Sequence, residues 1–338
     1  MAAHSITPSP HHPITHLDGV LVIHKPSGPT SHDVVSVARR VLGVRRIGHT
    51  GTLDPLARGV LPLVIGRATR LAQFFTRADK EYEADVRLGV RTTTYDATGD
   101  SVEAVRDREP ASLTVNEIEE ALAGFRGTHL QHPPAFSAKK ISGIPAYRMA
   151  RQKQAVDLAP VEVTVHALDV LAWQDERLRL RVVCSSGFYV RSLAHALGER
   201  LGTGACIEGL LRRRSGEFGL DRALPLADLE RSPRESLGRI IPMPELLPAL
   251  PGVVLTLEGV RQATRGGVIG PRHIAQWRGA PPPRRSLRSL SQRPANNDEP
   301  PLAGTSPHVR LLHPDGRLLA VAQPTHAEGT LHPGIVLE

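Results

Sequence analysis

The chain has 338 residues with 40% apolar side chains, which is enough for one large domain or for a large and a small one. Its 42 Lys and Arg exceed its 34 Asp and Glu, and the formal charge of +8 favours a polyanionic partner such as nucleic acid. The chain has only two cysteines, which argues against a disulfide framework and a cysteine-based zinc site. No apolar run approaches the roughly 18 residues of a membrane span, which argues against a membrane protein.

The first 17 residues are rich in Pro, His and Ser and have neither a basic start nor an apolar core. We therefore expect a disordered tail rather than a signal peptide, and a cytoplasmic protein. The 16 histidines are scattered along the chain, so we expect no metal site.

The first third of the chain alternates apolar runs with turn residues. Residues 19–24 predict a buried strand, and Ser31 is a candidate N-cap for a helix with apolar residues at helical spacing up to Leu42. Residues 60–66 predict a second buried segment, followed by a short helix over 69–75. Residues 81–88 alternate strictly and predict a strand with one wet face, on which Tyr82 points inward. By itself, an inward tyrosine is most simply an ordinary core residue.

The middle of the chain predicts a helix over residues 116–125 and a hairpin of strands over 161–171 and 178–184. The segment 185–194 passes from turn to helix and places Arg191 near the helix start. A cation is unfavourable there, which suggests a specific carboxylate or phosphate partner, although a solvated arginine is the simpler alternative. The basic cluster at 212–214 suits phosphate contact but equally suits a solvated face.

Beyond a proline-rich stretch over 232–251, β structure resumes at 253–255, and residues 308–312 and 317–322 flank a hairpin turn. Between them, residues of about 279–305 have the composition of a disordered basic insertion. The whole pattern predicts an α+β domain followed by a small all-β domain.

Residues 48–59 form the stretch most suggestive of chemistry. Glycines permit backbone conformations that are barred to other residues, and Pro55 holds Asp54 in the extended region, so one carboxylate is presented on a loop between two apolar segments. A surface turn explains this stretch equally well when it is taken alone.

Several motifs occur in a fixed order over roughly residues 18–220. They are Lys25-Pro26, residues 48–55 with Gly59 and Leu61-Pro62 behind them, Lys80-Glu81-Tyr82, Pro133-Pro134 with Ser137-Ala138 and Lys140, residues 187–193, and the basic run that ends at Ser215-Gly216. Each motif is weak alone, since residues 48–51 also fit the Gly-x-x-Gly of KH domains. The ordered set resembles the TruB family of tRNA pseudouridine synthases.

The resemblance implies a mixed, largely antiparallel central sheet with flanking helices over residues 18–246, the pseudouridine synthase fold. It also implies a small β-rich, PUA-like RNA-binding module over 250–338, interrupted by the basic insertion. The implied reaction is the isomerisation of uridine 55 in the T-arm (TΨC loop) of tRNA to pseudouridine, without metal or organic cofactor. The implied partner is tRNA, and we expect a monomer with no membrane and no obligatory protein partner.

The resemblance also assigns roles to single residues. Asp54 matches the catalytic aspartate, which either attacks the base as a nucleophile or helps to form a glycal-type intermediate. Arg191 matches the arginine that pairs with this carboxylate and keeps it ionised. Tyr82 matches the tyrosine that stacks on the target uracil. The substrate-binding positions implied are His49, which occupies the gap left by the flipped base, Tyr189 and Leu210, which line the pocket, and the basic Lys140.

Lys25 and Pro26 match a motif that we interpret as support beneath the catalytic loop. Thr93 stands where many relatives carry an acid, although Asp96 remains nearby. Two other functions stay open on sequence alone. One is an RNA-binding or RNA-folding factor without turnover, which has no need for Asp54 and Arg191 together. The other is a dyskerin-type enzyme that works with guide RNAs, for which the N-terminal tail shows no docking segment.

Overall fold

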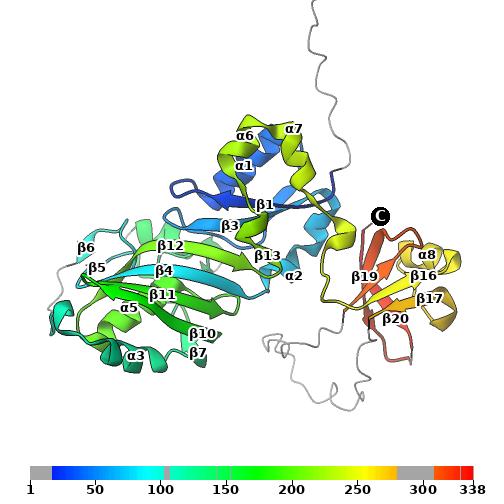
Figure 1. The fold of residues 1–338 in the computed structure, drawn as a ribbon. Helices are drawn as coiled ribbons and strands as arrows, with labels where there is room; N and C mark the ends of the chain where they lie inside the picture. The colour runs from blue at the N-terminus through cyan, green and yellow to red at the C-terminus, as the bar shows by residue number, and fades with distance from the viewer. Residues whose placement is uncertain are drawn as a thin grey trace, which may run out of the picture.

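The computed structural model describes residues 17–102, 107–141, 143–152, 154–279, 308–327 and 329–337. They form an 11-stranded sheet, a separate 5-stranded sheet near the C-terminus and two short hairpins, with helices beside them (Figure 1). This arrangement confirms the expected α+β fold with a small β-rich unit at the end of the chain. The tail expected over 1–17 and the insertion expected over about 279–305 lie almost wholly outside the described residues.

The central sheet has the strand order β14-β1-β3-β12-β4-β11-β10-β7, with β13, β15 and β2 paired at its sides. Only the β1–β14 and β3–β12 pairs are parallel, so the sheet is largely antiparallel, as expected. Its strands are β1 (Gly19–Lys25), β2 (Ile47–His49), β3 (Arg58–Ile65), β4 (Lys80–Leu88), β7 (Gly127–Gln131), β10 (Val161–Gln174), β11 (Arg177–Cys184), β12 (Ala205–Ser215), β13 (Phe218–Gly219), β14 (Leu224–Pro225) and β15 (Ile241–Pro242).

One face of this sheet is apolar and the other carries paired charges. Tyr82 and every second residue after it on β4 are buried, because successive side chains of a strand point to opposite faces. On the opposite face, arginines of β11 and β12 pair with acids of β4, as in Arg179–Asp85 at 2.8 Å and Arg213–Glu83 at 2.9 Å. The apolar face therefore holds the core, while the ladder of ion pairs neutralises much of the basic charge on the other face.

Helices α1 (Ser31–Leu42), α3 (Val115–Ala123) and α5 (Val190–Leu201) contribute buried residues to the main core beside this apolar face. The helix at residue 31 begins where expected, but Ser31 is not its N-cap. Thr30 accepts the capping hydrogen bond from the backbone of Asp33, and the Asp33 side chain completes a capping box. The Ser31 hydroxyl is instead buried and hydrogen-bonded to the backbone of Leu53, so it helps to hold the Asp54 loop.

A second apolar cluster joins the two sheets. It combines β1 and β3 residues such as Val20 and Val64 with Phe75 of α2 (Ala72–Thr76) and with Leu312 and Val321 of the C-terminal sheet. The C-terminal sheet is therefore attached to the central sheet by buried side chains as well as by the connecting chain.

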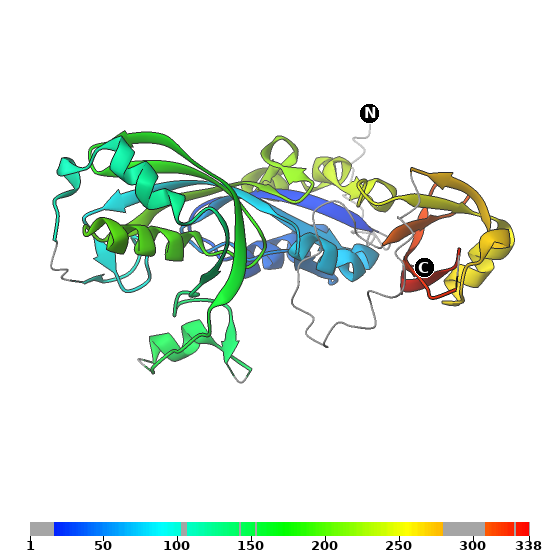
Figure 2. The same ribbon diagram turned by 90° about the horizontal axis from the view of Figure 1, so that it is seen from below.

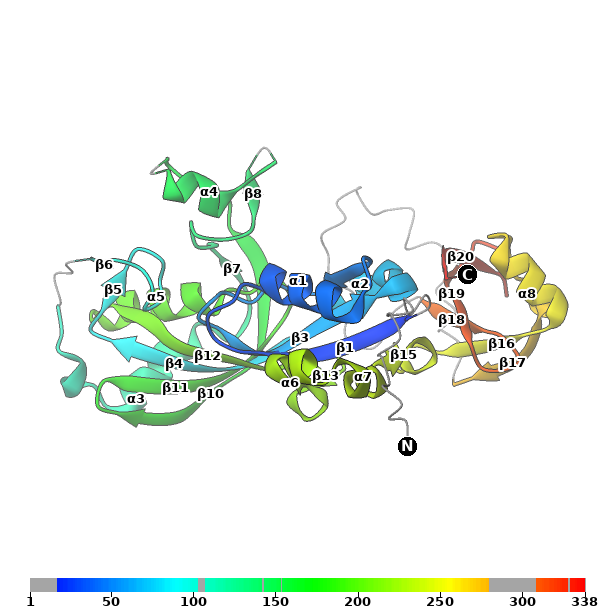
Figure 3. The same cartoon turned by 90° about the horizontal axis from the view of Figure 1, so that it is seen from above.

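The C-terminal sheet has the order β17-β16-β18-β19-β20. Its elements are β16 (Gly252–Leu255), α8 (Leu257–Thr264), β17 (Ile274–Arg278), β18 (Val309–Leu312), β19 (Leu318–Pro324) and β20 (Leu331–Val336). The expected hairpin is present as the antiparallel β18–β19 pair. In the view of Figure 3 this sheet lies at one end of an elongated molecule.

A small arm stands away from the central sheet between β7 and β10. It consists of β8 (Lys140–Ile141), β9 (Ile144–Pro145) and α4 (Ala146–Arg151), and both Figure 2 and Figure 3 show it projecting from the body. The remaining short strands and α-helices are β5 (Arg91–Thr92), β6 (Ser101–Val102), α6 (Leu226–Arg231) and α7 (Pro233–Ser236).

Candidate active site

Asp54 lies on the loop that connects β2 to β3, and the backbone of this loop is held from below. The Lys25 ammonium is fully buried and donates hydrogen bonds to the carbonyls of Pro26, Pro55 and Ala57, the last at 2.7 Å. The backbone NH of Gly28 donates to the Pro55 carbonyl at 2.8 Å. The support predicted for Lys25-Pro26 is thus confirmed, and the loop presents Asp54 from a fixed backbone.

Arg191 contacts Asp54 from the first turn of α5. Its Nε lies 2.8 Å from Oδ2 of Asp54, and its side chain is 6% exposed while that of Asp54 is 37% exposed. The other guanidinium nitrogens donate to the carbonyls of Thr94 and Phe136, both at 2.9 Å. The carboxylate partner suggested by an arginine near a helix start is therefore present, and Arg191 holds Asp54 at the edge of solvent.

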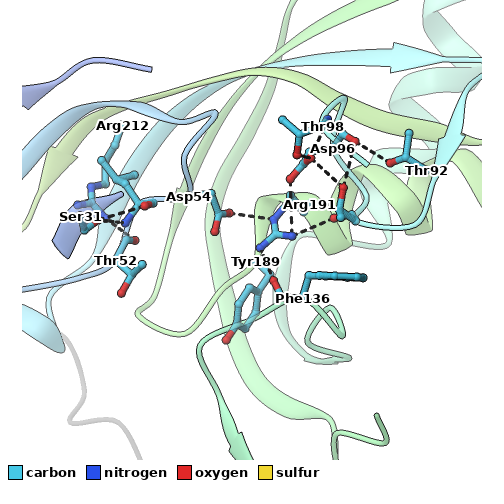
Figure 4. Close-up of polar contacts among 12 residues, drawn as sticks. Ser31, Thr52, Asp54, Thr92, Asp96, Thr98, Phe136, Tyr189, Arg191 and Arg212 are labelled. Carbon is cyan, nitrogen blue, oxygen red and sulfur yellow. Dashed lines mark hydrogen bonds and ion pairs between the residues drawn. The ribbon is translucent and has the colours of Figure 1, made fainter. Parts of the chain in front are cut away.

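A second carboxylate lies on the other side of Arg191, as Figure 4 shows. Asp96 is 5% exposed, and its Oδ2 is 3.7 Å from Nη1 of Arg191. Its Oδ1 accepts hydrogen bonds from the hydroxyls of Thr94 and Thr98 and from the backbone of Thr98. Two carboxylates thus lie against one buried guanidinium, and of the two only Asp54 is accessible to solvent.

Two tyrosines lie beside this pair. Burial raises the pKa of the Tyr82 hydroxyl, and the nearby Asp54 charge adds to the rise while Arg212 opposes it. Burial likewise raises the pKa of Tyr189, with the same small addition from Asp54. Tyr189 directly precedes α5, where its backbone NH and carbonyl are both hydrogen-bonded to the side chain of Gln131. Both rings are neutral at physiological pH and can offer apolar faces to a base.

The remaining residues expected to bind substrate fall in different places. Leu210 belongs to the same apolar cluster as Tyr82, and on β12 it pairs with Ala84 of β4, two residues along that strand from Tyr82. His49 ends β2, where burial lowers its pKa and the charges of Arg212 and His32 lower it further, so its imidazole is neutral. Lys140 is exposed on the projecting arm, and its side chain makes no hydrogen bond or ion pair within the described residues.

Only two of the three arginines of the basic cluster at 212–214 lie on a solvated face. Arg212 is 1% exposed and donates to the carbonyls of Val60 at 2.8 Å and Gly51 at 3.0 Å, so it supports the Asp54 loop and cannot reach a phosphate. Arg213 and Arg214 pair with acids of β4. The signal was available in the sequence: two residues after the inward Leu210, a strand places Arg212 on the same buried face.

Gly59 explains how β12 comes so near to this loop. A Cβ added at Gly59 would lie 2.3 Å from the carbonyl oxygen of Arg212, and the residue has a φ of +107°. Only glycine permits this backbone contact, so the loop glycines serve packing against Arg212 as well as chain reversal.

The described part of the chain contains neither a group of possible metal ligands nor a helix that could span a membrane. No group of three or more His, Cys, Asp and Glu side chains there could hold a metal ion. None of the helices in the same residues is long and apolar enough to cross a membrane.

Comparison with known proteins identifies the family. Residues 39–190 match the model of the TruB family pseudouridylate synthase N-terminal domain. The chain is 51% identical over 239 residues to a tRNA pseudouridine synthase B of Solibacter usitatus, covering 70% of this chain and 80% of that protein. This chain belongs to the TruB family. A second relative of the same description, from Aromatoleum aromaticum, is 44% identical over 240 residues and is covered to 77%.

Solved structures align with almost the full chain. A Cbf5-Nop10-Gar1 complex contains a chain that aligns with a TM-score of 0.67 and 25% identity, over 95% of this chain and 85% of that one. An H/ACA RNP bound to a substrate RNA containing 2'-deoxyuridine aligns with a TM-score of 0.66 and 24% identity, over the same shares of the two chains. The second likeness shows the fold alone, and it includes the C-terminal sheet.

Proposed function

We propose that this pseudouridine synthase, an isomerase, converts uridine 55 in the T-arm of tRNA to pseudouridine, with Asp54 as the catalytic carboxylate. One observation carries the proposal: a half-exposed aspartate is fixed 2.8 Å from a buried arginine and lies beside two tyrosines. The relatives' names support tRNA as the substrate.

The reaction needs no redox partner, because product and substrate have the same atoms. The bond from ribose C1′ to uracil N1 breaks, the base turns, and a bond from C1′ to C5 forms. The C5 proton leaves to solvent and N1 takes up a proton. Asp54 can serve by attacking the base or by stabilising charge on the ribose while a glycal-type intermediate forms. Arg191 pairs with the carboxylate at 2.8 Å and orients it in either case.

Reaching the glycosidic bond requires that the uridine leave the RNA stack. Flipping costs a few kcal/mol, and stacking on an aromatic face returns about 1 to 3 kcal/mol. We propose that Tyr82 supplies this face, that Tyr189 and Leu210 line the pocket, and that His49 fills the gap in the RNA. The neutral imidazole of His49 suits insertion between bases, since it carries no charge to desolvate.

We also propose that the chain acts on RNA as a monomer without an obligatory protein partner, and that the C-terminal sheet is a PUA-like RNA-binding module. The exposed cations Lys140 and Arg151 on the projecting arm suit phosphate contact. A pure RNA-binding or RNA-folding factor would use the same basic surfaces. It would not need a carboxylate held against a buried arginine, which is why turnover is the better proposal.

The test is pseudouridine mapping by carbodiimide labelling and primer extension on unmodified tRNA. We expect one Asp54-dependent stop in the T-loop with wild-type protein and none with Asp54→Asn, whose amide is nearly isosteric but not anionic. Binding of tRNA should be largely kept by the variant. A stop of wild-type intensity with Asp54→Asn would remove Asp54 from catalysis, and a stop elsewhere in the tRNA would refute the proposed site choice.

A further inference from the structure

One stripe of α5 holds the loop that carries Asp96. Arg191, His195 and Glu199 are spaced four residues apart and therefore lie on one face of the helix. Arg191 binds this loop as described above. One turn further along, the ring of His195 stacks on the ring of Tyr95, and after another turn Glu199 pairs with Arg91 at 2.7 Å. Three successive turns of α5 therefore contact the segment from Arg91 to Asp96.

Tyr95 lies between the two loop groups that contact Arg191. The carbonyl of Thr94 accepts a hydrogen bond from Arg191, and the carboxylate of Asp96 lies 3.7 Å from it. The carbonyl of Tyr95 accepts from the backbone NH of Ile207, which fixes the opposite side of this segment to β12. Any movement of Tyr95 is therefore passed to both neighbours and, through them, to Arg191.

The geometry of Tyr95 is unfavourable unless something holds it. Its φ is +64°, in the left-handed region that bulky residues avoid. Its ring centroid lies 3.9 Å from that of His195, with 5° between the two planes, so the rings are in full parallel contact. Burial lowers the pKa of His195, which keeps the imidazole neutral at pH 7 and leaves stacking as the contact between the two side chains.

We infer that Tyr95 and His195 are positioning residues: their stack holds the segment from Thr94 to Asp96 against Arg191 and so sets where Arg191 presents its guanidinium to Asp54. The inference rests on the proposed roles of Asp54 and Arg191. In the described residues neither side chain makes a hydrogen bond, ion pair or ring contact with Asp54, so both act through Arg191.

The variants are chosen to distinguish the effect of losing the ring stack from the effect of changing the backbone conformation at residue 95. Tyr95→Phe keeps the ring, whereas Tyr95→Asn removes it but keeps a residue that tolerates positive φ. His195→Leu removes the partner ring, and His195→Phe restores one. The readouts are single-turnover release of tritium from C5 of uridine in labelled tRNA, the tRNA Kd, and the thermal unfolding midpoint.

We expect Tyr95→Asn and His195→Leu each to slow the single-turnover rate about tenfold, a change of about 1.4 kcal/mol in the barrier. The tRNA Kd should stay within about twofold, and both Phe variants should react at near wild-type rates. The double variant Tyr95→Asn/His195→Leu should be no slower than either single one, because both remove the same contact.

Wild-type rates for Tyr95→Asn, or independent effects that multiply in the double variant, would overturn the inference. So would a weakened Kd with an unchanged rate. If Tyr95→Asn fails to fold, the comparison of His195→Leu with His195→Phe decides the matter alone. Asp54→Asn is measured in parallel. Turnover by that variant would refute the proposed function. An inactive Asp54→Asn beside a fully active Tyr95→Asn would refute only the positioning role of the Tyr95–His195 stack.

Discussion

Replacing Arg212 by Met tests the support beneath the Asp54 loop. The substitution keeps much of the side-chain volume but removes the donors that reach the carbonyls of Val60, Gly51 and Thr52 at 2.8, 3.0 and 3.4 Å. Arg212 is 1% exposed, so water does not replace those donors without movement of the loop. Three carbonyls would lose the hydrogen bond from Arg212 together.

The size of the effect follows from the geometry. Each of the two shorter bonds to this charged donor is worth about 1.5 to 3 kcal/mol, and the longest contributes little. Against this, no ion pair of Arg212 exists in the described residues, so its removal also relieves the desolvation of a buried cation. We expect a net loss of about 3 kcal/mol in the free energy of unfolding, which leaves a typical domain folded.

The assay is urea unfolding of Arg212→Met beside Arg213→Met, with single-turnover rates for both. Arg213 is the neighbouring residue, half-exposed and paired with Glu83 at 2.9 Å, and its loss should change stability by at most about 1 kcal/mol. We expect Arg212→Met to react about a hundredfold more slowly, because a displaced loop misplaces Asp54. Equal and small stability losses in the two variants would refute the reasoning.

Three further variants test single contacts. Asp96→Asn should slow single turnover at least about tenfold with unchanged tRNA Kd, because Arg191 loses an anion 3.7 Å away; an unchanged rate would contradict this. Tyr82→Phe should keep tRNA affinity within about twofold, since stacking needs only the ring; a large loss of affinity would show that the hydroxyl binds RNA. Burial lowers the pKa of Lys25 to about 8, so the folded state binds fewer protons than the unfolded one above that pH and stability rises with pH. Lys25→Met should remove about 1 kcal/mol of that rise between pH 8 and 9 in urea unfolding, and an identical slope would contradict the shift.

The sequence by itself determined the local elements and the ordered motifs. Strict alternation over residues 81–88 predicted β4 and the inward direction of Tyr82, because side chains of a strand alternate whatever lies around it. The glycines around Asp54, together with Pro55, predicted a loop that presents a carboxylate. An arginine at the start of α5 indicated an anionic partner, because a helix start repels cations.

Tertiary structure alone decided which charges meet. Arg212 and Arg213 are neighbours in the chain, but the pairing of β12 with β4 buries the first beneath the Asp54 loop and leaves the second on the wet face. Lys140 looks equally basic in the sequence, yet it lies on an arm projecting from the body. The partner of Asp54 comes from a helix far along the chain. Such contacts depend on strand register and helix placement, which are set by burial of the whole core and not by any local pattern.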